Sequence, residues 1–279
     1  MIRVNMSIFR LLSTLLLLSP LAAPALELSG ELVQGGMLVG RVNPGEQVAV
    51  MGREVRVDEN GLFVFGLGRD APSEIEVITE NGDQAPERHR FAVKQRTYRE
   101  QRVDGVPQKT VTPPVEVLER IRREAALVAE ARAGDDLRKD FLAGFKKPLE
   151  GPITGVYGSR RVYNGTPGRP HYGLDIAAPT GTAVFAPAPG VVKLSYDDMF
   201  YSGGTLIVDH GYGVTSTFIH LSELLVEEGQ RVERGDAIAR VGATGRATGP
   251  HLDWRINWFN VRLDPAVVMD NFPAVEVLP

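Results

Sequence analysis

The chain has 279 residues, of which 43% are hydrophobic and 24% charged, and its formal net charge is −4. A chain of this length suggests about two domains with real cores, and the acidic balance argues against non-specific binding to nucleic acid. The absence of cysteine excludes disulfides, thiol catalysis and cysteine-based metal centres, so any metal ion must bind to His, Asp or Glu.

Residues 1–25 have the composition of a secretory signal peptide. Arg3 and Arg10 precede the leucine-rich run Leu11–Leu21, and Ala23–Ala25 supplies the small residues expected near a cleavage site. A membrane anchor is the alternative, but a spanning helix needs roughly 20 apolar residues and this run is shorter. The sequence therefore predicts an exported protein that acts in the periplasm or the cell envelope.

Residues 26–96 alternate apolar and polar side chains over short segments, which is typical of β-strands. Asn60-Gly61 is a strong turn signal between Glu54–Asp58 and Leu62–Phe65. Repeated strands at this spacing predict a small N-terminal β-sandwich. Because no catalytic residue types cluster there, we expect this part to be a scaffold or a recognition module.

Residues 97–147 are predicted to form a linker with one amphipathic helix. The segment from Tyr98 to Pro114 is polar and contains proline, and Thr112 is a plausible cap for a helix that ends near Gly134. Apolar residues recur at helical spacing along it, and charged residues lie on the opposite face. The apolar stripe is Leu118, Ile121, Ala125 and Val128, and the charged face includes Glu119, Arg122, Arg123 and Glu130. We interpret the helix as a packing spacer whose charged face is solvated.

Residues 148–279 are rich in strand signals again and contain four of the five histidines of the chain. The segment Val214–His220 alternates, with Thr215, Thr217 and Ile219 on one face of the expected strand. The fold class is therefore predicted to be mainly β. It combines the N-terminal β-sandwich, the linker helix and a C-terminal antiparallel β-sheet domain.

Two pairs of residues in this C-terminal half could bind a metal ion. His171 and Asp175 are four positions apart, and Gly173 between them can let the backbone turn so that both side chains converge. His251 and Asp253 are two positions apart, so on a strand they project from the same face. Zinc accepts imidazole nitrogen and carboxylate oxygen, and a catalytic zinc site combines three protein ligands with one open position.

The order of motifs from His171 to Leu252 resembles the LytM/lysostaphin family of zinc metallopeptidases, peptidase family M23. The motifs are His171-x-Gly-x-Asp175, Val208-x-His210-Gly-Tyr-Gly213, Phe218-x-His220-Leu221 and Thr244-Gly-x-x-x-Gly-Pro-His251-Leu252. The resemblance implies a zinc ion and hydrolysis of peptide bonds in peptidoglycan. The signal peptide and the small β-rich N-terminal domain are also similar to a subgroup of bacterial members.

The resemblance implies roles for individual residues. His171 and Asp175 match the first two zinc ligands, while His220 and His251 match histidines that are catalytic in the family. The third ligand is a histidine in the family, and this sequence has Asp253 at that position. An aspartate can bind zinc through oxygen, so the expected metal ligands are His171, Asp175 and Asp253.

Taken with the resemblance, the sequence predicts a zinc metalloendopeptidase that cleaves stem peptides or cross-links of peptidoglycan. A degenerate, non-catalytic member that binds cell wall or activates a partner amidase is the alternative, because one ligand is changed. Cell-wall amidases and division proteins are the expected protein partners, and nucleic acid is not expected.

Other residues near these motifs have less specific signals. Arg160 and Arg161 are expected in a solvated turn, although they could instead meet carboxylates of the substrate. His210 matches a family position that does not bind metal, and we expect a structural role. The candidate substrate contacts are Tyr157, Tyr163 and Tyr172.

Overall fold

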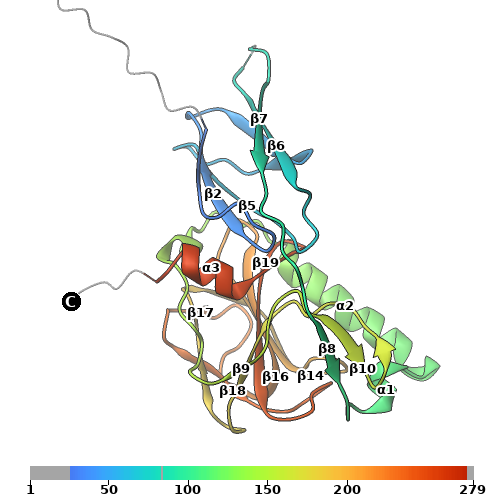
Figure 1. Cartoon of the computed structure of the whole chain (residues 1–279). Helices are drawn as coiled ribbons and strands as arrows, with labels where there is room; N and C mark the ends of the chain where they lie inside the picture. Colours follow the sequence, from blue (N-terminus) through green and yellow to red (C-terminus); the bar gives the residue numbers. More distant parts are fainter. Residues whose placement is uncertain (1–25, 83, 275–279) are drawn as a thin grey trace, which may run out of the picture.

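The computed structural model describes residues 26–82 and 84–274, and β-strands dominate it (Figure 1). The predicted mainly β class is confirmed by a large antiparallel sheet beside one long helix, α2 (Leu118–Ala133). The predicted signal peptide at residues 1–25 lies outside the described residues. Within the part of the chain that is described, no helix is both long and apolar enough to cross a membrane.

Two small antiparallel sheets form the N-terminal part, seen at the top of Figure 1. One has the strand order β1-β2-β5 and the other has the order β4-β3-β6-β7. Apolar side chains of both sheets are buried in the same core cluster. The strands are β1 (Glu27–Ser29), β2 (Met37–Arg41), β3 (Gln47–Val50), β4 (Arg53–Val55), β5 (Leu62–Gly66), β6 (Glu74–Glu80) and β7 (Glu87–Ala92).

The predicted turn at Asn60-Gly61 is present, but it does not join two paired strands. Gly61 adopts a φ of +79°, and its N–H donates to the carbonyl of Asp58. Of the flanking strands, β4 pairs with β3 and β5 pairs with β2. The turn therefore carries the chain from one sheet to the other.

The segment predicted as a linker has regular structure of its own. β8 (Glu100–Val103) pairs in parallel with β10 (Arg160–Tyr163), and β10 also pairs with β11 (Thr166–Pro167). The helical elements of the segment are α1 (Gln108–Val111), a 3-10 turn at Val115–Val117, α2, and a second 3-10 turn at Asp140–Ala143. The polar part of the segment is thus attached to the C-terminal part through β8.

Helix α2 ends at Ala133, directly before the predicted stop at Gly134, but its start and its buried face differ from the prediction. It begins after Val117, because Thr112 and Pro113 each precede a proline, which favours extended backbone. The predicted charged face is exposed as expected, whereas the apolar stripe is at most half-buried. The buried residues include two charged ones, Glu124 and Arg132.

A ten-stranded antiparallel sheet forms the C-terminal part, and its main path is β17-β14-β15-β16-β19-β12-β9. β18 pairs with β16 and β13, and β20 pairs with β19. Helix α2 packs against β14 and β15 on one side of this sheet (Figure 1). The elements are β9 (Ile153–Gly155), β12 (Leu174–Ala177), β13 (Ala183–Phe185), β14 (Gly190–Met199), β15 (Gly203–Asp209), β16 (Val214–Leu224), β17 (Arg231–Val232), β18 (Ala237–Val241), β19 (His251–Trp258), β20 (Val261–Leu263) and α3 (Pro265–Asn271).

The N-terminal and C-terminal parts share one buried core. Phe65 of β5 and Trp258 of β19 belong to the same cluster of buried apolar residues. At their junction, a Cβ on Gly66 would lie 2.6 Å from a methyl group of Leu263. The division of the chain into separate domains at residues 96 and 147 stays a prediction.

Candidate functional site

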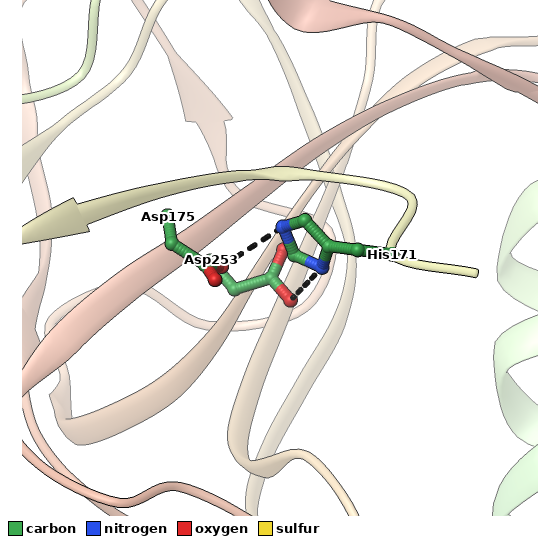
Figure 2. Close-up of side chains that lie close together, drawn as sticks. All are labelled: His171, Asp175 and Asp253. Carbon is green, nitrogen blue, oxygen red and sulfur yellow. Dashed lines mark ion pairs between the residues drawn. The ribbon is translucent and has the colours of Figure 1, made fainter. Parts of the chain in front are cut away.

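The register of β12 and β19 brings the predicted metal-binding residues together. These antiparallel strands are neighbours, and Asp175 lies directly opposite Asp253. His171 is in the loop before β12, where its backbone N–H donates to the carbonyl of Ser159. Figure 2 shows the three side chains converging on one point.

Gly173 is required by close approach rather than by a special turn. It does not have a positive φ, so a left-handed backbone is not what requires a glycine at this position. A Cβ on Gly173 would lie 2.0 Å from Oδ1 of Asp253 and 2.8 Å from the carbonyl oxygen of Trp254. Any side chain here would displace the Asp253 carboxylate or separate the two strands.

The three converging side chains are almost fully buried. His171 and Asp175 are each 5% exposed and Asp253 is 2% exposed, and one ligand atom from each lies within 4.8 Å of the others. Nε2 of His171 is 3.1 Å from Oδ1 of Asp175, and Nδ1 of His171 is 3.9 Å from Oδ2 of Asp253 (Figure 2).

Two of these ligand atoms have no hydrogen-bond partner among the described residues. They are Nε2 of His171 and Oδ1 of Asp175, and both are buried. Leaving such atoms unsatisfied is costly, and a divalent cation between them would satisfy both. One imidazole and two carboxylates form a donor set that zinc accepts. The residues therefore fit a metal ion.

Two arginines that the sequence analysis did not connect with this site bind its carboxylates. Nη2 of Arg161 lies 2.6 Å from Oδ2 of Asp175. Arg255 binds both oxygens of Asp253, with its Nε 3.0 Å from Oδ1 and its Nη2 2.6 Å from Oδ2. The expectation of a solvated turn is wrong for Arg161, which is 8% exposed. The alternation of β19 could have indicated Arg255, because it shares a strand face with Asp253.

These contacts keep both carboxylates ionised. Burial alone would raise the pKa of Asp253, but Arg255 and His171 outweigh burial and the pKa lies well below its usual range. Burial and the negative charge of Asp253 would likewise raise the pKa of Asp175. The contacts of Asp175 with His171 and Arg161 outweigh both effects, so its pKa is lowered. The negative charges of Asp175 and Asp253 are thus neutralised by the positive charges of Arg161 and Arg255.

His220 and His251, the two predicted catalytic histidines, lie side by side at the same site. Their ring centroids are 4.8 Å apart, and Nε2 of His251 is 3.9 Å from Oδ1 of Asp175. Nδ1 of each ring is 2.8 Å from a backbone carbonyl oxygen, that of Thr244 for His220 and that of Gly249 for His251. Since a carbonyl only accepts, Nδ1 carries the proton and Nε2 is the free nitrogen of each neutral ring.

Both the pKa and the backbone conformation of His220 are unusual. Burial lowers its pKa to about 4, so the ring is neutral near pH 7. Its backbone adopts a φ of +68°, a strained value for a residue with a side chain, although it lies within β16. Such strain persists only where the surrounding structure fixes it, and it is concentrated at functional sites.

A cavity of about 1060 Å³ opens over this group of residues. The residues that line it include His171, His220 and Asp253 of the large sheet and its loops, and Glu124 and Arg132 of α2. The local pattern of α2 predicted a packing spacer and did not indicate that this helix lines a cavity. Of the candidate substrate contacts, Tyr163 lines the cavity, whereas Tyr157 is buried and donates to the carbonyl of Arg262.

His210 and Tyr172 do not line the cavity. His210 is fully buried, with Nδ1 2.6 Å from the carbonyl oxygen of Pro189 and Nε2 2.9 Å from Oγ of Ser216. Burial lowers the pKa of His210 to about 4.

Residues 169–265 match the model of peptidase family M23. A 150-residue segment is 36% identical to peptidoglycan DD-endopeptidase ShyA of Vibrio cholerae, covering 52% of this chain and 33% of that protein. A 91-residue segment is 44% identical to the DD-carboxypeptidase/endopeptidase Mpg of Neisseria meningitidis, covering 32% of this chain and 21% of that protein. The matches thus span about a third or less of these relatives.

One solved structure matches nearly the whole chain. It is the crystal structure of a Pseudomonas aeruginosa protein assigned to peptidase M23, with 32% sequence identity and a TM-score of 0.66. The match covers 87% of this chain and 97% of that one. The likeness therefore extends well beyond the segment that matches the family model.

Proposed function

The chain belongs to peptidase family M23, and we propose that it is a peptidoglycan hydrolase. The finer proposal is a zinc-dependent endopeptidase that cleaves peptide bonds in stem peptides or cross-links. The observation that carries it is the convergence of three buried ligand atoms inside the segment that matches the family, where Nε2 of His171 and Oδ1 of Asp175 have no hydrogen-bond partner among the described residues.

The relatives support the substrate class. ShyA is a peptidoglycan DD-endopeptidase, and Mpg is a DD-carboxypeptidase/endopeptidase. Because peptidoglycan lies outside the cytoplasmic membrane, we propose the cell envelope as the place of action. A predicted export signal at residues 1–25 is consistent with this location.

We assign His171, Asp175 and Asp253 as the metal ligands. When bound, zinc would polarise the scissile carbonyl and lower the pKa of water. Gly173 allows Asp253 to approach this point, and Arg161 and Arg255 form ion pairs with the two carboxylates. With one histidine and two aspartates, the loaded site is formally neutral apart from the two arginines.

We assign His220 and His251 to proton transfer and to stabilising the developing oxyanion. Each ring donates Nδ1–H to a backbone carbonyl, which fixes the ring and leaves Nε2 free. The low pKa of His220 keeps its Nε2 unprotonated at neutral pH, where it can accept a proton. Once protonated, the same atom can donate to the leaving amine or to the oxyanion.

A non-catalytic protein that binds cell wall or activates an amidase is the second candidate, and one observation favours it. Arg255 already binds both oxygens of Asp253, so this carboxylate is satisfied without a cation. In this case the cavity would serve as a binding groove, with an amidase or a division protein as its partner.

Two measurements on the purified protein separate the candidates. The zinc content is determined by mass spectrometry, and dye release from labelled peptidoglycan is followed with and without a chelator. The hydrolase proposal expects bound zinc and dye release that the chelator abolishes. Protein that releases no dye with zinc present, yet stimulates an added amidase, would reject the hydrolase in favour of the activator.

A further inference from the structure

Arg132 is a buried guanidinium without a carboxylate partner. It lies near the end of α2, is 4% exposed and lines the cavity. Its Nη2 donates to Oγ1 of Thr217 over 2.9 Å. Its Nε has no hydrogen-bond partner, and no acidic side chain among the described residues forms an ion pair with it.

Two other arginines that line the cavity, Arg161 and Arg255, do have carboxylate partners. Each of them binds a buried aspartate. Removing a cation from water is costly unless an opposite charge replaces the solvent, and Arg132 has no such compensation within the described chain. Burial lowers the pKa of Arg132, and the nearby charges of Arg262 and Arg255 lower it further. Among the described residues, no carboxylate forms an ion pair with Arg132 that would offset its burial.

Arg262 adds a second positive charge beside Arg132. It lines the same cavity, and its Nη1 makes a long hydrogen bond of 3.4 Å to Oδ1 of Asn257. Burial and the charge of Arg255 lower the pKa of Arg262 to about 10, so it stays charged at neutral pH. Among the described residues, neither Arg132 nor Arg262 has a carboxylate partner.

Unsatisfied polar atoms gather on the sheet face beneath these arginines. Thr217 of β16 lies opposite Arg255 of β19, and Thr215 lies opposite Asn257. Oγ1 of Thr215 and Nδ2 of Asn257 are buried and have no partner within the described structure. These two atoms do not line the cavity, whereas Arg132 and Arg262 do, so the two arginines are the groups that a ligand in the cavity would meet.

We propose that Arg132 and Arg262 form an anion subsite that binds a carboxylate of the peptidoglycan peptide. The inference rests on the proposed function, because that function places the peptide in this cavity. Thr217 and Asn257 are two and four residues along the sheet from the Asp253 position, a distance of about 7–13 Å at the rise of a strand. An extended peptide covers the same distance in about two to four residues. The carboxylate would thus lie that far from the scissile bond.

The test is equilibrium binding to metal-free protein, with a chelator present so that hydrolysis cannot interfere. Fluorescence anisotropy compares a labelled stem peptide that has free carboxylates with the same peptide after all its carboxyl groups are amidated. Wild type is expected to bind the acid about tenfold more tightly than the amide, as one charge-assisted hydrogen bond implies. The R132Q variant is expected to bind both peptides equally.

Arg122→Gln is the matched control. It removes the same charge from the same helix, but at an exposed position. It should keep the preference for the acid. Arg262→Gln should lose it, and this variant decides the question if R132Q does not fold. R132Q is expected to melt at a higher temperature than wild type without ligand, because an uncompensated buried charge is removed.

Equal binding of acid and amide by wild type would overturn the proposal, and so would a preference that survives in R132Q. Binding of inorganic phosphate without any preference for the acid peptide would also overturn it. The outcome is separable from the proposed function. Loss of dye release with an intact acid preference rejects only the hydrolase, whereas hydrolysis without an acid preference rejects only the subsite.

Discussion

The two ends of the cavity differ in how their charges are paired. At one end, the carboxylates of Asp175 and Asp253 are bound by Arg161 and Arg255, so the chain balances its own charge there. At the other end, Arg132 of α2 is buried without an acidic partner among the described residues. The chain therefore supplies its own countercharges at the first end, whereas the second end is built for a negatively charged group that the chain does not supply.

The largest expected effect comes from removing one carboxylate at the paired end. Asp253→Ala should abolish both zinc binding and dye release, because it deletes an assigned ligand. It also leaves the partly buried Arg255 without its carboxylate partner, which should lower the free energy of unfolding by about 1–3 kcal/mol. Zinc content and denaturant unfolding measure the two effects.

Asp197→Ala is the control for this change, since Asp197 is exposed and forms no ion pair among the described residues. It should leave zinc content and stability unchanged. Full zinc content in Asp253→Ala would place Asp253 outside the coordination shell, and its pairing with Arg255 would then be its whole role.

The next effect separates proton transfer from metal binding at the same end. His220→Ala should keep its zinc but lower the rate of hydrolysis by about 10²–10⁴-fold, the usual contribution of a general acid or base. Turnover of a labelled peptide and zinc analysis of the same sample provide the check. His89→Ala, on β7, is the matched control. A wild-type rate in His220→Ala would remove this residue from the mechanism.

Lowering the pH should destabilise the protein, because it favours protonation of His210, which is fully buried in the folded chain. The pKa of His210 is about 4 in the folded chain and near 6.5 when unfolded, so the unfolded state binds the proton more readily. The stability that neutral His210 contributes is present above pH 6.5 and is lost as the pH falls toward 4. Over that window the loss amounts to about 3 kcal/mol.

Denaturant unfolding at a series of pH values measures this loss. In His210→Gln, the dependence on pH between 6.5 and 4 should become shallower by that amount. An unchanged pH dependence in the variant would show that other groups cause the acid sensitivity.

The smallest expected effect concerns the ion pair between Arg255 and Asp253, which we expect to compete with zinc for the carboxylate of Asp253. Arg255→Gln frees the oxygens of Asp253 and removes a positive charge next to the site, so zinc affinity should rise about tenfold. Competition with a chromogenic chelator measures it, and Arg122→Gln should show no change. A weaker zinc affinity in Arg255→Gln would mean that Arg255 orients Asp253 for the metal rather than competing for it.

Local patterns predicted the parts of the site that lie on one strand or in one short loop. The spacing of His171 and Asp175 and the strand alternation of His251 and Asp253 are short-range properties, and the register of β12 against β19 then brings them together. Arg161 was not predicted as a partner, because its contact with Asp175 depends on where β10 lies relative to β12. No pattern within either segment specifies that placement.

Helix α2 shows the same limit. Its end at Ala133 follows from local signals, but its buried face is set by tertiary contacts. Glu124 is buried because it accepts hydrogen bonds from Arg120 and from the backbone N–H of Phe200. Arg132 is buried by its contact with Thr217. Both residues are of charged types that usually lie on the solvated face of a helix, so the sequence alone predicts that they are exposed.

Anomalous diffraction at the zinc edge, from crystals grown with zinc, tests the central claim most directly. The account predicts one strong peak enclosed by the side chains of His171, Asp175 and Asp253. An ordered site with no peak there, and with Arg255 still bound to both oxygens of Asp253, would contradict it.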